Sequence, residues 1–393
     1  MSGATGKNTT PPPIVILSEM AAHLLGPVFL DRAATKSKNL SCLLADEVPD
    51  SIPSLGTTVL AGSRLYRRIC VCYSRWMKRR AEMCSGRAAQ PRLSESIESR
   101  ENRWLKRFRA ALAGDAVGRR GESGHIEGEI AGVEGARLVE TALRSGVEIV
   151  AVLFSETGAK HISRLAPWIP PEARLLRTTD RLFASASGTE TPQGVAALVR
   201  PRAAVFDDLM GGDPLILVLA GVQDPGNVGT LVRTAEALGA TGIAACAASG
   251  IGTSNPFAPK ALRASAGAAL RLPVLRGISA PVLLAQLRVA GVRVYAACPD
   301  ELPDGAANET DKKPMAPWEI DWRGPAALLI GNEGAGLPAD LVRSADAIVR
   351  IPQAARELHA NAAQEEDLPA ESLNAGVAGS ILLYEAARQR GLR

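Results

Sequence analysis

The sequence has few aromatic residues. Phe, Trp and Tyr make up 4% of its 393 residues, whereas the chain carries 37 glycines and is 46% hydrophobic. Such a composition fits layered α/β structure better than an all-β sandwich, which depends on β-branched and aromatic strands. The length allows two or three domains, and the hydrophobic content is sufficient to give each of them a core.

Paired cysteines are also absent. The six cysteines show no Cys-x-x-Cys pair and no regular spacing, and they stand at positions 42, 70, 72, 84, 246 and 298. Cys70, Cys72 and Cys84 could contribute to a metal site, but no second pair or nearby histidine completes a tetrahedral set. We therefore expect reduced thiols, no bound metal and a cytoplasmic protein.

A long uninterrupted apolar run is lacking as well. The most apolar early stretch, residues 14–30, is broken by Glu19, His23 and Pro27 and has no basic segment before it. A membrane-spanning helix needs about 20 largely apolar residues, and a signal peptide needs a basic start. We expect neither a signal peptide nor a contact with the membrane.

The common nucleotide-binding and hydrolytic signatures are missing. The chain has no Gly-x-Gly-x-x-Gly at the start of a first βαβ unit and no Gly-x-x-x-x-Gly-Lys-Ser/Thr. These two motifs mark dinucleotide-binding folds and P-loop enzymes. No Ser/His/Asp order and no metal-ligand set replaces them, so the function has to be sought in other motifs.

Charge is unevenly distributed. The net charge is +4, but residues 1–120 hold 20 Lys and Arg against 10 Asp and Glu. Residues 64–80, RLYRRICVCYSRWMKRR, mix these cations with aromatic rings, a composition that can bind single-stranded nucleic acid. A poorly ordered solvated tail explains the same segment, and we favour that interpretation for residues 1–93 as a whole.

A buried strand followed by an amphipathic helix is the clearest element of the chain. Residues 215–220, LILVLA, form a continuous apolar run that is typical of a parallel strand buried on both faces. Asp-Pro-Gly-Asn at 224–227 predicts a turn, with Asn227 as the cap of a helix from Val228 to Gly239. This arrangement places Asn227 and Arg233 beyond the carboxyl end of the strand, where open α/β sheets bind ligands.

Strands and helices alternate along the rest of the chain. We expect a basic extension over 1–93, a small α/β domain over 94–205 and a larger parallel-sheet α/β domain over 206–393, with 201–214 as the linker. The first element of the small domain is predicted to be a helix over 94–112. Further strands are expected at 148–154, 195–199, 241–246, 272–275, 292–297, 326–330 and 347–351, and the last helix at 372–390.

Three strand-to-loop junctions of the larger domain carry unusual residues. They are DPGNVGTLVRTA at 224–235, LLIGNEGAGLP at 328–338 and ESLNAGVAGSILLYEA at 371–386. Each junction alone has an ordinary explanation, because glycine-rich turns are common, Asn227 and Ser372 suit helix caps and Arg233 suits a solvated helix face. Their combination at successive strand ends is the informative feature.

In this order, the three junctions resemble the signature motifs of the SpoU (TrmH-like) branch of the SPOUT RNA methyltransferases. The resemblance runs from Leu215 to the end of the chain and includes NPFAPKALRASAGA at 255–268, GNEG at 331–334, Ile-Pro at 351–352 and ESLN at 371–374. Residues 99–200 more weakly resemble the small substrate-binding domain, related to ribosomal-protein folds, that precedes the catalytic domain in ribosomal-RNA members. Nothing in residues 1–93 matches.

The resemblance implies a 2′-O-ribose methyltransferase that uses S-adenosylmethionine, with a deep C-terminal trefoil knot and a homodimer that completes each site. Motif matching places the cofactor against Gly331, Asn332, Gly334, Ile351 and Leu373. It places Asn227, Arg233, Glu333, Ser372 and Asn374 around the reacting ribose. One departure is the long stretch between Ile-Pro and ESLN, residues 353–370, which falls in the cofactor-binding region and is interpreted as a bulge or a lid.

The expected reaction explains these residue types. A ribose 2′-hydroxyl must lose its proton as it attacks the methyl group in line, and a guanidinium does not readily accept a proton. We therefore expect Arg233 to hold the adjacent phosphate and to stabilise the developing alkoxide, with Ser372 and Asn374 orienting it.

Ribosomal RNA is the favoured substrate because of the extra N-terminal domain. Transfer RNA and a catalytically silent RNA-binding or ribosome-assembly factor remain the alternatives. Loss of the motif residues would favour the silent factor, and all five are present.

Overall fold

The computed structural model describes residues 94–115, 117–120, 126–299, 312–353 and 373–391. The chain divides into two compact units, Met1–Gln90 and Pro91–Arg393, and every described residue belongs to the second unit. The basic segment at 64–80, Ser372 and most of the 353–370 stretch lie outside the described residues, so the predictions for them stay open.

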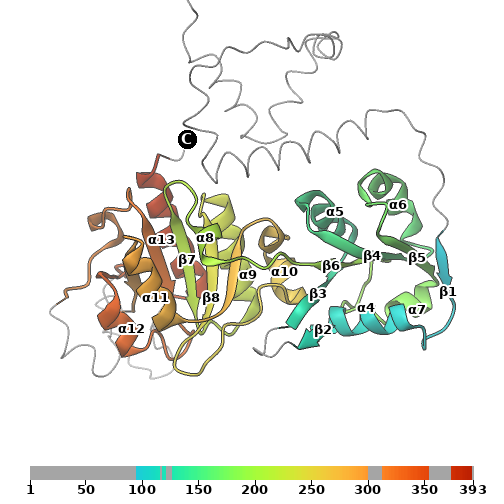
Figure 1. The fold of residues 1–393 in the computed structure, drawn as a ribbon, viewed down its shortest axis with the longest axis horizontal. Coiled ribbons are helices and arrows are strands. Elements are labelled where there is room, and N and C mark those ends of the chain that lie inside the picture. Colours follow the sequence, from blue (N-terminus) through green and yellow to red (C-terminus); the bar gives the residue numbers. More distant parts are fainter. Residues whose placement is uncertain (1–93, 116, 121–125, 300–311, 354–372, 392–393) are drawn as a thin grey trace, which may run out of the picture. The chain divides into compact units, whose positions relative to one another are not determined.

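The first half of the second unit is built on a mixed six-stranded sheet with the order β1-β5-β4-β6-β3-β2 (Figure 1). β1, β5 and β4 run parallel, whereas β6 is antiparallel to both β4 and β3, and β3 is antiparallel to β2. The strands are β1 (Glu95–Ile97), β2 (Val117–Arg120), β3 (Ile126–Glu134), β4 (Glu148–Phe154), β5 (Arg174–Thr178) and β6 (Val195–Arg200).

Short helices accompany this mixed sheet. Their apolar stripes supply its core, as when α4 buries Trp104, Leu105 and Phe108. The helix predicted over 94–112 is wrong before residue 103, because residues 95–97 form the edge strand β1 and the helix starts only after the Asn102 cap. The helices are α4 (Arg103–Ala113), α5 (Ala136–Ser145), α6 (Ala159–Leu165), the short 3₁₀ turn η1 (Ala166–Trp168) and α7 (Asp180–Ala184).

The second half is built on a six-stranded sheet in which every pairing is parallel, with the order β12-β10-β11-β7-β8-β9. The central strands β7 and β11 are buried at every position, which explains their continuous apolar sequences. The strands are β7 (Leu215–Ala220), β8 (Gly242–Ala247), β9 (Val274–Ser279), β10 (Arg293–Ala297), β11 (Ala326–Ile330) and β12 (Ala347–Val349).

Helices cover both faces of the parallel sheet, as predicted (Figure 1). Alternate residues of β7 point to opposite faces: Leu217 packs in one core with α9 and α13, and Ile216 packs in another with α11 and α12. The helical elements are α8 (Phe206–Leu209), α9 (Pro225–Ala237), α10 (Pro259–Ala264), η2 (Ala268–Leu270), α11 (Ala280–Val289), η3 (Pro317–Glu319), α12 (Ala339–Ser344) and α13 (Ala375–Gln389). Among the described residues, no helix combines the length and the apolar character that crossing a membrane requires.

Several predicted boundaries need correction. The stretch 201–214, predicted as a linker, contains the short helix α8. Asn227 is not the cap of α9: Asp224 is, and its side chain accepts a hydrogen bond from the Asn227 N–H. Asp224 takes this role because Pro225 already has the backbone angle of a first helical residue. α13 begins at Ala375 with Asn374 as its cap, so the helix predicted from residue 372 starts three residues later.

Candidate functional site

The candidate site lies where two neighbouring parallel strands end. β7 pairs directly with β11, with Leu219 opposite Ile330, so the loops that follow them leave the same edge of the sheet side by side. The first loop leads into α9 and carries Asn227, and the second carries the Gly-Asn-Glu-Gly turn of residues 331–334. The strand direction predicted from the sequence therefore brings the first two motifs together.

Glu333 joins these two loops. Its carboxylate accepts hydrogen bonds from the backbone N–H groups of Gln223 and Asp224, each at 3.0 Å, and from the Asn227 side-chain amide, also at 3.0 Å. Partial burial raises the pKa of Glu333, but these donated hydrogen bonds outweigh it and hold the pKa below the ordinary value. Glu333 is thus a fixed anion at neutral pH.

The turn that carries Glu333 is shaped by close backbone contacts. Asn332 and Gly336 bond each other through both backbone groups, and the Asn332 side chain accepts hydrogen bonds from the N–H groups of Gly334 and Ala335. A Cβ on Gly331 would lie 2.5 Å from the Gly336 carbonyl, so only glycine fits there. The same Asn332 donates to the Gly221 carbonyl at 3.0 Å, which anchors the turn to the loop after β7.

The start of α13 is the third part of the site. A Cβ on Gly376 would lie 3.1 Å from the Asn374 side-chain oxygen and 3.2 Å from that of Asn227, so the two asparagines meet over this glycine. A Cβ on Gly379 would lie 2.3 Å from Leu231, and Thr234 and Ser380 share a hydrogen bond of 3.1 Å. The small residues of α13 let it lie close against α9.

Of the five residues expected around the ribose, the structure brings three together. Asn227, Glu333 and Asn374 converge, whereas Arg233 lies six residues after Asn227 on α9, which corresponds to a rise of about 9 Å. Arg233 is exposed, and it makes no hydrogen bond or ion pair with another described residue. Ser372 is outside the described residues.

The expected cofactor residues divide in a similar way. Gly331, Asn332 and Gly334 form the turn after β11. Ile351 follows β12, which is separated from β11 by β10, and it packs against the core. Leu373 is 38% exposed and directly precedes the cap of α13. Within the described part of the chain, no hydrogen bond links Ile351 or Leu373 to the turn.

Two further charged residues belong to this edge and were not selected from the sequence. Asp224 caps α9 and forms an ion pair of 2.8 Å with Lys260 of α10, and the hydrogen bond from Lys260 lowers the pKa of the Asp224 carboxyl. The Asp-Pro-Gly sequence was the available signal, because Asp followed by Pro is a typical helix start. α10 lies so close to α9 that a Cβ on Gly229 would be 2.5 Å from the Ala264 Cβ.

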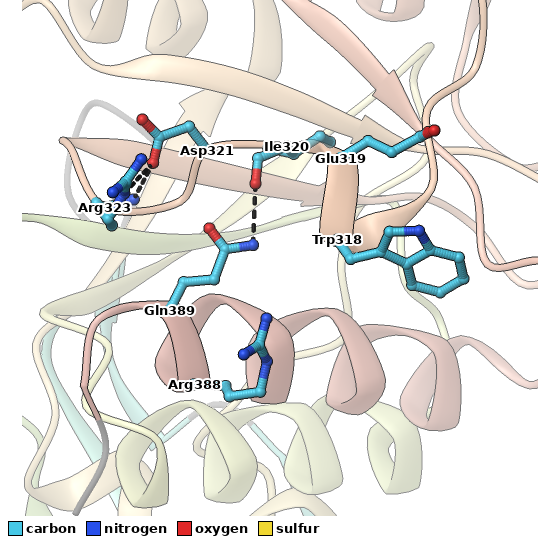
Figure 2. Close-up of a pocket in the computed structure, with 7 residues that line it drawn as sticks. All are labelled: Trp318, Glu319, Ile320, Asp321, Arg323, Arg388 and Gln389. Carbon is cyan, nitrogen blue, oxygen red and sulfur yellow. Dashed lines mark hydrogen bonds and ion pairs between the residues drawn. The ribbon is translucent and has the colours of Figure 1, made fainter.

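Two hollows in the surface do not include any residue expected in the site. The first has a volume of about 390 Å³ and lies where α13 meets the segment after η3, with Gln389 donating to the Ile320 carbonyl and Asp321 paired with Arg323 (Figure 2). The second, about 940 Å³, includes Glu129, Asn255 and Arg276 in its wall, and there Arg276 pairs with Glu129 at 2.5 Å. Neither hollow carries the converging motif residues.

The described thiols show no reactive character. Cys246 and Cys298 are buried and free, and burial raises the pKa of Cys246 to about 12 and that of Cys298 to about 11. No group of three His, Cys, Asp or Glu residues in the described part of the chain could hold a metal ion. The other four cysteines are outside the described residues.

Comparison with known proteins agrees with the motifs. The profile of the SpoU rRNA Methylase family matches residues 214–384, and that of the MRM3-like substrate binding domain matches residues 129–197. The 23S rRNA (guanosine(2553)-2′-O)-methyltransferase RlmP of Bacillus subtilis is 31% identical over 64% of this chain and 86% of its own length. An uncharacterised tRNA/rRNA methyltransferase of Synechocystis is 32% identical over 66% of this chain and 84% of its own.

Solved structures give the same result for the fold. An AdoMet-bound rRNA methyltransferase from Sinorhizobium meliloti is 28% identical, with a TM-score of 0.59 over 75% of this chain and 98% of that one. The SpoU methyltransferase AviRb from Streptomyces viridochromogenes, in complex with AdoMet, is 25% identical, with a TM-score of 0.57 over 74% and 98%. The chain is an α/β protein that belongs to the SpoU rRNA methylase family, and it is an RNA methyltransferase.

Proposed function

We propose that the protein transfers the methyl group of S-adenosylmethionine to a ribose 2′-hydroxyl of ribosomal RNA. The observation that carries this proposal is the convergence of Asn227, Glu333 and Asn374 at one edge of a parallel sheet. These residues come from three separate motifs of the family. The relatives support the substrate, because RlmP of Bacillus subtilis is named for the same transfer to a guanosine of 23S rRNA.

The residues at this edge fit the cofactor. The backbone of the Gly331–Gly336 turn is open at Gly334, because a Cβ there would meet only the Asn332 side chain, at 3.7 Å. A ligand can therefore approach the backbone at this glycine, where a side chain would block it. Gly331, Asn332 and Gly334 would hold S-adenosylmethionine together with Ile351 and Leu373. When bound, the cofactor supplies an electrophilic methyl group on a sulfonium.

The polar side chains have distinct roles in this proposal. Glu333, kept ionised by its three donors, fixes the Asn227 side chain and the loop after β7. The Asn227 side-chain oxygen accepts no hydrogen bond from a described residue, so it is available to the ribose. Asn374 uses its oxygen to cap α13 and keeps its amide N–H groups for the 2′-oxygen, a role that this proposal also gives to Ser372.

Arg233 holds the phosphate next to the reacting ribose and stabilises the developing alkoxide. Because Arg233 is about a turn and a half of helix away from Asn227, the Arg233 of one subunit serves the site of another in this proposal. The arginine therefore acts within a homodimer rather than within one chain.

An exposed apolar stripe on α13 supports the homodimer. Leu373, Val377, Ile381 and Tyr384 recur at helical spacing and are 38%, 48%, 40% and 58% exposed. Three large apolar side chains along α13, with Leu373 just before its cap, suit a contact between two copies better than contact with water. Analytical ultracentrifugation tests this contact, and a monomer at micromolar concentration would contradict it.

The domain boundaries follow the same proposal. Residues 94–205, which include the match to a substrate-binding domain, bind RNA, and residues 206–393 carry the methyltransferase site. The trefoil knot that the family resemblance implies stays part of the proposal, and residues 354–372, between β12 and α13, lie outside the described residues. Because the proposed substrate is ribosomal RNA, we place the protein in the cytoplasm.

The test is methyl transfer from labelled S-adenosylmethionine to ribosomal RNA transcribed without modifications, with products mapped by primer extension that stops at 2′-O-methyl groups. Arg233→Lys is expected to lower turnover at least a hundredfold with cofactor affinity unchanged, because lysine lacks the two-pronged donor set. The matched control is Arg288→Lys on α11, an exposed arginine that bonds the Ser344 carbonyl, which should behave as wild type.

The outcomes separate the alternatives. Transfer at one ribosomal position establishes the reaction and the target, and transfer to tRNA alone would move the substrate to that class. Cofactor binding and methyl transfer both absent would favour a silent RNA-binding factor. Unchanged turnover in Arg233→Lys would remove the role given to that arginine.

A further inference from the structure

A cluster of arginines surrounds one tryptophan on the mixed sheet. Arg103 and Arg107 extend from α4, and Arg174 extends from β5, the strand next to the edge strand β1. Their guanidinium carbons lie 5.8, 5.0 and 5.6 Å from the centre of the Trp104 ring. We call these three residues the arginine patch. The ring attracts cations through its faces, so it gathers charges that would otherwise repel one another.

The patch carries more positive charge than its neighbours balance. Glu95 lies 3.4 Å from Arg174, and Glu101, two residues before Arg103, is paired with Lys106 at 2.5 Å. Neither Arg103 nor Arg107 is paired with a carboxylate from the described residues. At least two guanidinium charges therefore remain exposed and uncompensated in one small area.

A second tryptophan, Trp168 of η1, has a stacked arginine that does have an acidic partner. Arg144 stacks over Trp168 at 4.6 Å, and it is held by Glu140 at 3.3 Å. Glu140 also contacts Arg164 at 3.3 Å. Stacking of an arginine on a tryptophan thus occurs twice in this half of the molecule, but only the arginine patch leaves two of its guanidinium groups without an acidic partner.

The chemistry of the patch selects phosphate rather than bases. Trp104 is 6% exposed and packs in a hydrophobic core, so its ring is not available for a base to stack on. The exposed groups are guanidinium forks, which only donate hydrogen bonds and match the geometry of phosphate oxygens. Contacts of this kind position an RNA without reading its sequence.

We propose that the arginine patch binds the phosphate backbone of the RNA substrate at a region outside the nucleotide that is methylated. This inference rests on the proposed function for the identity of the RNA. The patch belongs to the mixed sheet, whereas the candidate site belongs to the parallel sheet, so the two make separate contacts with one RNA. The patch contributes affinity, and the parallel-sheet site selects the ribose.

The salt dependence of binding measures this contact. Each phosphate contact that is lost lowers the slope of log affinity against log salt by about 0.7 to 0.9. Replacing Arg103 and Arg107 together with glutamine should therefore lower the slope by about 1.5 and weaken binding on the order of tenfold at 0.15 M salt. Glutamine keeps part of the side-chain stem that covers Trp104.

The experiment uses the full chain and unmodified ribosomal RNA transcribed in vitro, with affinity measured from 0.05 to 0.3 M salt. The variants are Arg103→Gln with Arg107→Gln, and Arg174→Gln alone, which tests the patch from β5 if the α4 double variant fails to fold. Arg144→Gln is the matched control, because it also removes an arginine stacked on a tryptophan but leaves the arginine patch intact. The control should keep the wild-type slope.

A double variant and an Arg174→Gln variant that both bind RNA with the wild-type slope would overturn the inference, and so would an equal loss in Arg144→Gln. Methyl transfer and cofactor affinity of the wild type are measured alongside. If the wild type methylates RNA and the variants keep the wild-type slope, the role given to the arginine patch is wrong and the proposed function stands. If no RNA is methylated but the slopes fall as expected, the proposed function is wrong and the phosphate contact stands.

Discussion

Each of the two sheets has one glutamate that organises a loop, and the two glutamates do it differently. Glu134, at the end of β3, is 6% exposed and accepts hydrogen bonds from the Ser187 and Thr189 hydroxyls and the Gly188 N–H. Glu333, in the turn after β11, is much more exposed than Glu134 and accepts hydrogen bonds from two backbone N–H groups and from Asn227. The first carboxylate closes a loop, and the second holds a polar side chain open to a ligand.

Strand direction explains the difference. In the mixed sheet, β3 and β4 both run antiparallel to β6, so the carboxyl ends of neighbouring strands are divided between two edges. In the parallel sheet all six carboxyl ends share one edge, and β7 and β11 are direct neighbours. The loops that follow β7 and β11 therefore leave the same edge, which brings their motif residues together although they are distant in sequence.

Turnover should separate the two glutamates most strongly. Glu333→Gln replaces a carboxylate oxygen with an N–H₂ group facing N–H donors, which should displace Asn227 and lower turnover by tenfold to a hundredfold. Glu134→Gln should leave turnover per folded molecule within about twofold, because it disturbs a loop of the other sheet. Single-turnover methyl transfer measures both variants. Equal losses would show that the mixed-sheet loop also serves the reaction.

Glycine substitutions sharpen the contrast between a packed loop and an open turn. A Cβ on Gly188, in the loop held by Glu134, would lie 2.7 Å from the Leu112 carbonyl oxygen, whereas Gly334 has open space beyond 3.7 Å. Gly188→Ala should reduce the free energy of unfolding by about 1–3 kcal/mol. Gly334→Ala should be within about 0.5 kcal/mol of wild type, yet weaken binding of S-adenosylmethionine. Urea unfolding measures the stability of both variants, and calorimetric titration measures their affinity for S-adenosylmethionine. A Gly188→Ala variant as stable as wild type would contradict the packing argument.

The smallest expected effect is a dependence of stability on pH at Glu333. The pKa of Glu333 in the fold lies below its ordinary value of 4.5, so the ionised form stabilises the folded state. This stabilisation is complete above pH 4.5 and is lost as the pH falls through the folded-state pKa. The free energy of unfolding of the wild type should exceed that of Glu333→Gln by about 1 kcal/mol at pH 7 and by less at pH 3 to 4. Urea unfolding measures this difference. A difference that does not change with pH would exclude the charge as its cause.

The sequence predicted the buried strands well. Residues 148–154, 215–220 and 326–330 are strands with the predicted bounds, because a strand covered on both faces is a short continuous apolar run between turn residues. The edge strand β1 was missed because three residues cannot show a period, and only its pairing with β5 identifies it. The cap at Asp224 was missed although Pro225 signalled it.

The sequence predicted which motifs form the site but not which contacts their residues make. The family motifs identified Asn227, Glu333 and Asn374, and the structure places them together. The partners of Glu333 are backbone N–H groups more than one hundred residues earlier, which no local pattern indicates. The separation of Arg233 from Asn227 was available from the sequence, because six residues along one helix correspond to a rise of about 9 Å, but it was not used to separate the two residues.

The contact of α13 with α9 also determines when the site exists during synthesis. Asn227, Glu333 and Asn374 lie on three segments, and α13 is translated after every other described element. A nascent chain that ends at β12 contains Asn227 and Glu333 but not Asn374. The enzyme therefore gains its complete polar cluster only once its final helix has docked, and partly made chains should not methylate the ribosomal RNA around them.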